Sequence, residues 1–312
     1  MNKKMIGFAA ISFILITSCS KNETDEKEMQ GKVIEFTKLN DRVPNKAAND
    51  STSNYGVYAV LKDGVPAATS WFMDNQEIDG KNNNYVPLKF WPKTGTIDFY
   101  SYAPFNSPNL VLSGVQWDTM APTFDIIYTV PANADEDLTF ATPVMGASTG
   151  PITFIFSHML AKISFEANLE NMLIDDGFEM TLNYVTLSVN YEEGENSLSS
   201  PAGWSHTVAP AKVTYSNRDT YLIMPQPANN LEVTTNVSIK HNGADYFSGN
   251  LKTSVLASIP NITSFDKGTN YHFTVTVGNL SQDDQGNPLF NVILFTSDIT
   301  PWFTESIPIT QQ

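Results

Sequence analysis

The sequence predicts an all-β protein, and three observations support this fold class. From Gly31 onward, short apolar segments are divided by Pro, Gly, Asn and Asp, the residues that favour turns. In the two clearest segments, 231–240 and 271–277, every second residue is apolar or weakly polar, as expected of strands with one buried and one solvated face. No segment has the length and period of an amphipathic helix, and residues 169–176 are expected to form a turn or two at most.

The 312 residues are enough for two domains, and a change in the phase of alternation marks where the domains would meet. The strongest apolar positions are even-numbered in Ile152–Phe156 and odd-numbered in Met159–Ala167. Because a slip of one residue turns every side chain to the other face, the chain must bulge at Ser157-His158 or pass from one sandwich to another. We therefore expect an N-terminal β-sandwich domain over residues 31–157 and a C-terminal one over residues 158–312.

The beginning of the chain predicts an exported lipoprotein. Lys3 and Lys4 precede an apolar run of roughly 11 residues, which is shorter than the ~20 needed to span a bilayer. The sequence Ile16-Thr17-Ser18-Cys19 then has the form of a bacterial lipobox. We expect residues 1–18 to be removed as a signal peptide and Cys19 to carry fatty acyl chains, two or more of which anchor a protein stably. The alternative is an ordinary secretory signal with a stray cysteine.

Composition agrees with export and limits the partners. With one cysteine there is no internal disulfide, but 41% hydrophobic residues are sufficient for core burial. The formal charge is -15, and an acidic surface of this kind repels phosphate groups, which argues against nucleic acid as a partner. Residues 19–30 are polar and acidic without a hydrophobic period, so they predict a solvated tether.

The sequence predicts no enzyme activity, no cofactor and no metal site. The histidines are scattered without metal-ligand spacing, and no Gly-x-Ser-x-Gly or phosphate-binding glycine loop occurs. We expect His158 to be a structural hydrogen-bonding residue and His272 to lie on a solvated strand face. The acidic clusters 135–137, 175–176 and 283–284 are flanked by turn residues, which favours solvated loops over calcium sites.

Eight motifs resemble, in their order and spacing, motifs of the Bacteroidetes fimbrillin family, and together they cover essentially everything after the tether. They are Tyr55-Gly56-Val57-Tyr58, Asn84-Tyr85, Phe90-Trp91-Pro92, Ile97–Phe105, Asp137–Ala141, Phe154–Phe165, Tyr221–Gln226 and Ile299–Trp302. Members often carry a Gln followed by Asp-Leu-Met before the domain boundary, where this chain has Glu136–Thr139, so the subclass stays open.

The resemblance implies two tandem transthyretin-like β-sandwich domains. It also implies a surface lipoprotein of a type V pilus, used in adhesion as a structural, tip or anchor subunit, with other pilin subunits as partners. The acidic run Ser20–Glu28 resembles the signal that sends Bacteroidetes lipoproteins to the outside of the outer membrane, so the lipid on Cys19 would hold the protein there. Host or bacterial surface glycans or proteins are further candidate partners.

Assembly by strand exchange is a further implication of the resemblance. A protease trims the precursor after a basic residue, and a terminal strand of another subunit fills the groove left by the first strand. Here Val33–Leu39 is the candidate first strand, and Arg42 and Lys46 are the candidate processing residues in a polar loop; an ordinary hairpin loop is the alternative. The candidate donor strand has Phe303, Ile307 and Ile309 on one face and is interrupted by Pro308; alternatively, it closes its own domain.

The rival function is glycan binding by an outer-membrane surface lipoprotein. Trp71, Trp91, Trp117 and Trp204 would stack on sugar rings if they were exposed and coplanar. Trp91 lies in a family-typical motif and Trp71 adjoins Phe72, which favours packing in the core or at a seam. A glycosidase built on paired carboxylates is a third class, but no such pair stands out.

Overall fold

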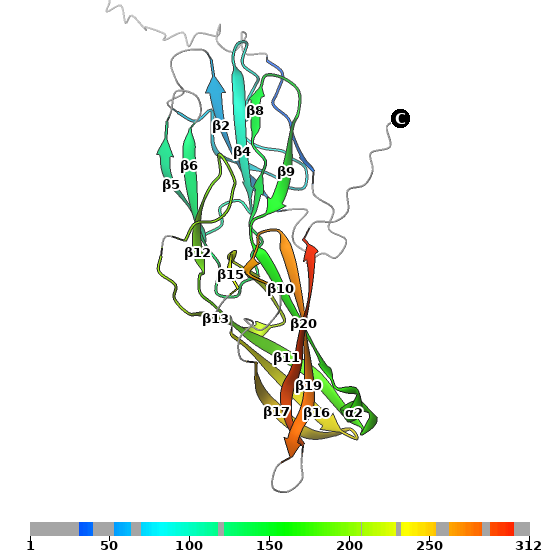
Figure 1. The fold of residues 1–312 in the computed structure, drawn as a ribbon. Helices are drawn as coiled ribbons and strands as arrows, with labels where there is room; N and C mark the ends of the chain where they lie inside the picture. Colours follow the sequence, from blue (N-terminus) through cyan, green and yellow to red (C-terminus); the bar gives the residue numbers. More distant parts are fainter. Residues whose placement is uncertain are drawn as a thin grey trace, which may run out of the picture.

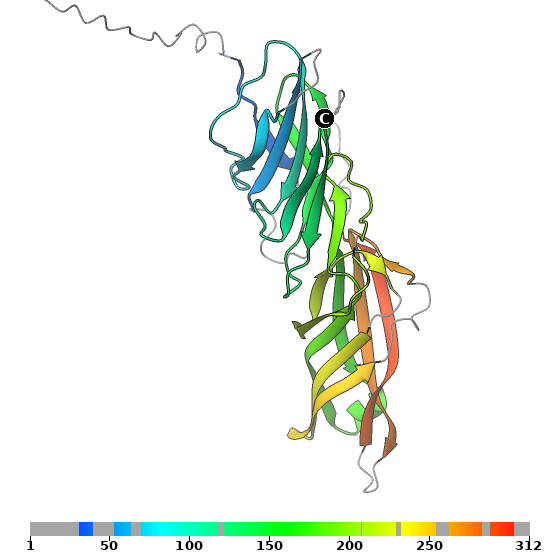
Figure 2. The same ribbon diagram turned by 90° about the vertical axis from the view of Figure 1, so that its left-hand side faces the viewer.

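The computed structural model describes residues 31–39, 53–63, 70–117, 122–206, 208–228, 232–253, 262–282 and 288–302. Within these ranges the regular structure is almost entirely β, and the one α-helix, α2 (Asn171–Asp175), lies where a turn or two was expected (Figure 1). The all-β class predicted from the sequence is confirmed. The molecule is elongated, with the sheets of the N-terminal half above those of the C-terminal half (Figure 2).

The upper part is built on a seven-stranded sheet with the order β1-β9-β7-β4-β2-β3, in which β8 also pairs with β4. β1 runs parallel to β9, and the other pairings in this sheet are antiparallel. The strands are β1 (Phe36–Leu39), β2 (Tyr55–Lys62), β3 (Met73–Ile78), β4 (Thr96–Ala103), β7 (Thr139–Ala141), β8 (Val144–Ala147) and β9 (Ile152–His158).

Both faces of this sheet are buried, as β4 shows, because every residue from Ile97 to Ala103 is buried. A three-stranded sheet of β5 (Leu110–Gln116), β6 (Thr123–Thr129) and β12 (Glu193–Ser197) packs against one face. The opposite face forms a cluster that we call the outer core. Its members are Ile34, Phe36, Tyr55, Val57, Ala59, Met73, Ile78, Tyr85, Trp91, Ile97, Phe99, Ala103, Ala141, Ile152, Phe154 and Phe156.

The lower part contains two four-stranded sheets, with the orders β14-β10-β19-β20 and β13-β11-β16-β17, and a short pair, β15 with β18. The strands are β10 (Ala161–Leu169), β11 (Phe178–Val189), β13 (Val213–Arg218), β14 (Thr220–Ile223), β15 (Gln226–Pro227), β16 (Glu232–His241), β17 (Ala244–Thr253), β18 (Ser264–Phe265), β19 (Thr269–Gln282) and β20 (Pro288–Pro301). The cluster at its far end, which we call the distal core, consists of Leu169, Leu173, Phe178, Val237, Ile239, Leu251, Val275, Val277 and Phe290.

The alternation seen in the sequence follows the burial pattern of the strands. Buried residues of β16 are odd-numbered from Val233 to Ile239, and those of β19 are odd-numbered from Tyr271 to Val277. The predicted change of phase is also present, because burial is even-numbered along β9 and odd-numbered at the start of β10. β9 and β10 belong to different sheets, so the chain passes from one sheet to another after His158 rather than bulging within one.

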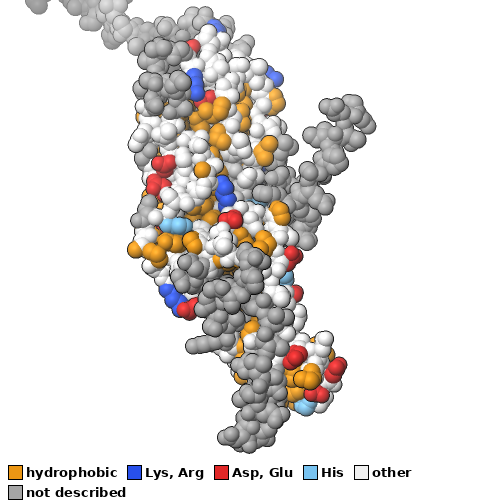
Figure 3. Space-filling view, viewed as in Figure 1, with side chains coloured by type: hydrophobic (Ala, Val, Ile, Leu, Met, Phe, Trp, Pro, Cys, Tyr) orange, Lys and Arg blue, Asp and Glu red, His pale blue; other side chains and the backbone are white. Residues whose placement is uncertain are grey.

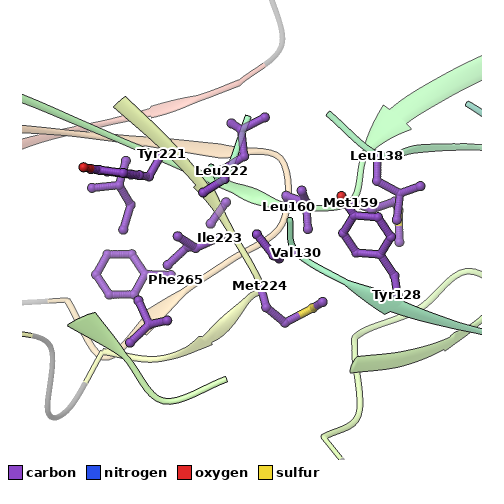
Figure 4. Packing of buried hydrophobic residues seen from close by; sticks show 14 of the residues in the cluster. Tyr128, Val130, Leu138, Met159, Leu160, Tyr221, Leu222, Ile223, Met224 and Phe265 are labelled. Carbon is purple, nitrogen blue, oxygen red and sulfur yellow. The ribbon is translucent and has the colours of Figure 1, made fainter. Parts of the chain in front are cut away.

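A large core, which we call the shared core, joins the upper and lower parts (Figure 4). Residues from both sides of position 158 meet in it, among them Tyr128, Leu138, Leu160 and Ile223. β12, which follows residue 158 by more than thirty positions, pairs with β6 and so belongs to a sheet of the upper part. The division of the chain into two domains at 157/158 stays a prediction. β12 comes from the C-terminal side of that division but pairs with β6 on its N-terminal side.

Candidate functional site

The candidate first strand, Val33–Leu39, contains β1, which lies at the edge of the seven-stranded sheet. β1 pairs only with β9 in the described part of the chain, with Phe36 opposite Ile152 and Leu39 opposite Ile155. The amide of Ile152 donates to the carbonyl of Glu35 at 2.8 Å. The hydroxyls of Thr37 and Thr153 lie 2.8 Å apart and share a hydrogen bond across the two strands. This pairing holds the first described strand against a strand from much later in the sequence.

The residues just before β1 are held by a second segment, 85–91. The amide of Ile34 donates to the carbonyl of Lys89, and the amide of Trp91 donates to the carbonyl of Lys32, both at 3.0 Å. The Tyr85 hydroxyl donates to the Ile34 carbonyl at 2.8 Å. A Cβ at Gly31 would lie 2.6 Å from the carbonyl oxygen of Trp91, so this close approach requires glycine.

Two side chains of residues 31–39 complete the outer core. Ile34 is fully buried and Phe36 is 3% exposed. The Phe36 ring stacks on Phe154 at 5.8 Å between centroids and meets Tyr85 and Phe99 edge-on at 5.3 and 5.9 Å. Burying one such side chain stabilises a fold by about 1.5–3 kcal/mol, so both together contribute strongly to closing the cluster. We call residues 31–39 the closing segment.

The closing segment contains an edge strand of the seven-stranded sheet. It forms the end of the sheet order, and no described strand lies beyond it. Its removal would leave one edge of β9 unpaired and would uncover the rings of Phe99 and Phe154. An unpaired edge beside an exposed apolar cluster favours pairing with another strand. In the structure, β1 covers this edge of β9 and these two rings.

The other residues that the sequence analysis selected for lipidation, processing and strand donation lie outside the described residues. They are Cys19, Arg42, Lys46, Phe303, Ile307 and Ile309. Their roles stay predictions. The described chain does include the flanks of the processing loop and of the donor run, which are Leu39, Ser53 and Trp302.

Trp302 marks the point from which the candidate donor run departs. Its ring stacks on the ring of His158 at 3.9 Å with an interplanar angle of 6°, and its amide donates to the carbonyl of Gly268 at 2.7 Å. The Nδ1 atom of His158 lies 2.9 Å from a carboxylate oxygen of Asp137, and both side chains are largely buried. The expectation that His158 makes a structural hydrogen bond is confirmed. The stacking on Trp302 was not predicted from the sequence, although both residues lie in motifs of the family resemblance.

The acidic clusters differ from one another. Asp175, the last residue of α2, and Asp176, in the turn after it, are both exposed, and Figure 3 shows acidic side chains beside exposed hydrophobic ones at this lower end. The cluster 135–137 differs from the expected solvated loop, because each carboxylate has a protein partner. Glu136 accepts from Ser107 at 2.6 Å, and Asp135 pairs with Arg218 at 2.7 Å. In the part of the chain that the structure describes, no three potential metal ligands come together.

The tryptophans pack against the protein. Trp71 meets Trp117 and Phe124 edge-on at 4.9 and 5.0 Å, and Trp91 is 7% exposed in the outer core. The indole nitrogen of Trp204 donates to the carbonyl of Met159 at 2.6 Å. These contacts confirm packing in the core and at a seam, which the sequence favoured over a sugar-stacking platform.

Buried tyrosines are the main perturbed titratable groups. Burial raises the pKa of Tyr100 to about 12, with a smaller contribution from the charge of Asp98, and burial likewise raises the pKa of Tyr221 to about 12. Asp98 itself is fully buried; it pairs with Lys62 and accepts from the amide of Gly146 at 2.7 Å. Asp98 and Tyr100 lie on β4, and Tyr221 lies on β14. Over the described ranges, the helix α2 is also far too short to cross a membrane.

Comparison with known proteins agrees with this architecture. The sequence model of the family described as Fimbrillin-like matches residues 42–302, and the chain belongs to that family. A solved fimbrial protein from Bacteroides vulgatus is 15% identical, covers 87% of this chain and 100% of its own, and superposes with a TM-score of 0.58. A "putative cell adhesion protein" from Bacteroides uniformis is 14% identical, covers 86% and 99%, and gives a TM-score of 0.54. At these identities the solved structures show the fold alone.

No curated protein matches the chain at a significant level. The family is nevertheless informative about class, because its proteins are structural proteins of surface fimbriae rather than enzymes. The chain is therefore a fimbrillin-like protein.

Proposed function

We propose that this protein is a lipid-anchored subunit of a surface fimbrium on the outer membrane and that it joins other subunits by strand exchange. The observation that carries the proposal is the closing segment, an edge strand at the start of the described chain that fills the outer core with Ile34 and Phe36. Cleavage after Arg42 or Lys46 would separate this segment from the rest of the chain. The opened edge would then accept the run that contains Phe303, Ile307 and Ile309 of another subunit.

The energetics favour a durable contact. Phe36 alone contacts three aromatic rings, and a donor strand that replaced it would recover comparable apolar burial at ~25 cal/mol per Å². Backbone hydrogen bonds to β9 would add to this and would fix the register. We also propose tandem transthyretin-like domains and a role in adhesion, because the family resemblance implies both.

The direct test is the identity of the mature N-terminus on native outer membranes. We expect N-terminal sequencing and mass analysis to find chains that begin at Val43 or Ala47 within polymers. The double variant Arg42→Ala, Lys46→Ala should remain monomeric and uncleaved, whereas the matched control Lys212→Ala, Lys240→Ala removes two exposed basic residues of the lower part and should assemble normally. Polymers built of untrimmed chains would contradict strand exchange.

Lipid anchoring has its own test. Metabolic labelling with a fatty acid should label the wild type and fail with Cys19→Ala, which should be released or retained at the inner membrane. A wild-type protein that takes up no label would contradict the lipoprotein proposal but would leave strand exchange untouched.

A further inference from the structure

Three exposed apolar side chains lie close together in the loop between β3 and β4, on the upper part of the molecule. Val86 is 85% exposed, Leu88 is 52% exposed, and Phe90 is exposed as well. We call these three residues the apolar ridge. Single exposed apolar residues are normal on a protein surface, but several side by side mark a candidate contact surface.

The apolar ridge is held in place from both ends. Tyr85 and Trp91, which flank it, are buried in the outer core. The hydroxyl of Tyr85 accepts from the amide of Lys89 at 3.2 Å, and the side-chain amide of Gln76 donates to the carbonyl of Val86 at 3.1 Å. Because a surface that is already ordered loses little conformational freedom on binding, this loop is well suited to make a contact.

Positive charge surrounds the apolar ridge. Lys81, Lys89 and Lys93 lie in its loop, and residues 80–95 contain no acidic residue. Glu77 and Asp79 precede the loop, and each accepts a hydrogen bond from an asparagine side chain. In a chain with a formal charge of -15, this loop is a local exception. The ridge therefore fits a surface that is both apolar and acidic.

The lower end of the molecule carries such a surface. Met172 is 61% exposed and Ile174 is 52% exposed on α2, and Asp175 and Asp176 come directly after them at the surface (Figure 3). We call these four residues the acidic tip. Residues 169–180 contain four acidic residues and no basic one. Lys240 on the neighbouring strand β16 offsets one of these charges, so the tip remains acidic.

We propose that the apolar ridge of one copy binds the acidic tip of a second copy of this chain. The ridge belongs to the upper part and the tip to the lower end of an elongated molecule, so a single chain cannot bring them together (Figures 1 and 2). In the contact, the apolar side chains of the two surfaces pack together and the lysines of the ridge loop face the aspartates of the tip. The contact is heterologous, because it joins two different surfaces.

A second copy accounts for both surfaces. An anionic membrane would account for the apolar ridge and its lysines, but it would leave the apolar side chains of the acidic tip without a role. The net charge of the chain opposes association. At about 0.1 M salt, however, screening confines charge interactions to roughly 10 Å, so the charges in the contact count for more than those far apart on two elongated molecules.

The contact is separate from strand exchange. It uses the chain with the closing segment in place, where the amide of Ile34 donates to the carbonyl of Lys89 at 3.0 Å and helps to hold the ridge loop. Two small apolar surfaces give a weak and reversible contact. It would bring untrimmed copies together on a crowded surface, where tethering raises the local concentration.

Charge reversal tests the pairing. The ridge variant carries Lys81→Glu and Lys89→Glu, and the tip variant carries Asp175→Lys and Asp176→Lys, each in an untrimmed chain that begins at Ser20 and so carries no lipid. Sedimentation velocity should show that the wild type associates reversibly as its concentration rises. Each variant alone should associate at least about tenfold more weakly, because like charges then face one another.

An equimolar mixture of the two variants gives the sharpest result. The reversed ridge of one variant then meets the reversed tip of the other, and the unchanged ridge meets the unchanged tip. We therefore expect the mixture to associate as strongly as the wild type, and raising the salt from about 0.05 to about 0.5 M should weaken both.

Two further variants serve as controls. Lys212→Glu with Arg218→Glu changes the net charge as much as the ridge variant does, but on another part of the surface, so it should associate like the wild type. Val86→Asn with Leu88→Asn keeps every charge and removes apolar surface from the ridge. It should weaken association, because the contact needs packing as well as charge.

The opposite results overturn the proposal. These are a wild type that stays monomeric at every concentration, a variant that associates as the wild type does despite its reversed charges, and a mixture no stronger than either variant alone. Binding to phosphatidylglycerol vesicles that requires Lys81 and Lys89, without self-association, would assign the ridge to a membrane instead. None of these results concerns the N-terminus of the mature chain, so strand exchange stands or falls by its own test.

Discussion

The outer core and the distal core are both apolar clusters between strands, yet they are closed in different ways. The distal core is closed by hairpins whose strands follow one another in sequence, β16 with β17 and β19 with β20. The outer core is closed by a segment at the start of the described chain, in which Thr37 bonds to Ile152, 115 residues away. A single cut after residue 39 would therefore detach the strand that closes the outer core without cutting a hairpin.

The comparison shows which kind of strand a fold can lose with least damage to the rest of its sheet. A segment at one end of the described chain and at the edge of a sheet contributes side chains without carrying any other strand in place. Its loss costs its own burial and pairing, but it leaves the remaining connections of the sheet intact. Four changes, in decreasing order of their effect on stability, test this difference between the parts of the molecule.

Alkaline pH should produce the largest difference in stability between the upper part of the molecule and the distal core. Burial raises the pKa of Tyr100 and Tyr221, both in the shared core, to about 12. It also raises the pKa of Tyr128 in the shared core and of Tyr55 in the outer core, whereas no tyrosine belongs to the distal core. A raised pKa means that the folded state holds its proton when the unfolded chain has lost it. The stability from these groups is complete below pH 10 and falls as the pH rises through 12.

Hydrogen exchange or tyrosine absorbance between pH 9 and 12 would check this prediction. We expect β4 and β6 to lose protection before β16 and β17 do. Loss of protection in β16 first, or at the same pH, would contradict the assignment of the sensitivity to the buried tyrosines.

Phe36→Ala should destabilise the outer core selectively. Removing this ring leaves a cavity among Tyr85, Phe99 and Phe154, and such truncations cost about 3–5 kcal/mol. Chemical denaturation should show the loss, and limited proteolysis should cut near residue 39 faster than in the wild type. Glu35→Gln, an exposed neighbour on the same segment, is the matched control and should change neither measurement.

Trp302→Ala should loosen the junction without opening either core. The variant removes the stacking on His158 and leaves the Asp137–His158 hydrogen bond in place. Because the indole is only partly buried, we expect a loss of about 1–2 kcal/mol, below that of a core aromatic. Hydrogen exchange should rise at the ends of β9 and β20 only. A rise throughout the distal core would mean that Trp302 supports the whole lower part.

Thr37→Val should have the smallest effect. It removes the hydroxyl pair with Thr153 on the solvent face of β1 while keeping the shape of the side chain. A cross-strand pair of this kind contributes about 0.2–1 kcal/mol, so the melting temperature should fall slightly and the segment should remain in place. Thr274→Val, which loses a bond to Glu166 in the lower part, is the matched comparison.

Much of this fold was readable from the sequence, because alternation with a period of two reports directly which face of a strand is buried. The change of phase between Phe156 and Ile163 located the passage between sheets for the same reason. The position of Val33–Leu39 as an edge strand depended instead on the family resemblance, since seven residues carry too little pattern to specify a partner. The parallel pairing with β9 has no local signal at all.

What the sequence could not supply was contact between distant motifs. His158 and Trp302 each stood in a recognisable motif, but nothing in the order of residues indicated that their rings would stack. The crossing of β12 into the upper part was equally hidden, because Glu193–Ser197 has few apolar residues and pairs with β6 through backbone bonds. The sequence predicted that Asp137 lies in a solvated turn, because the order of residues does not show that its carboxylate meets His158.

The central claim is that the closing segment is a separable part of the outer core. The most direct measurement is hydrogen exchange on a chain of residues 43–302, which lacks both the closing segment and the C-terminal run, with and without a synthetic peptide of residues 31–39. The account predicts that β9 and β4 lose protection in the shortened chain, that β16 and β17 do not, and that the peptide restores protection to β9. Protection of β9 equal to that of the full chain, or loss of protection in both cores together, would contradict it.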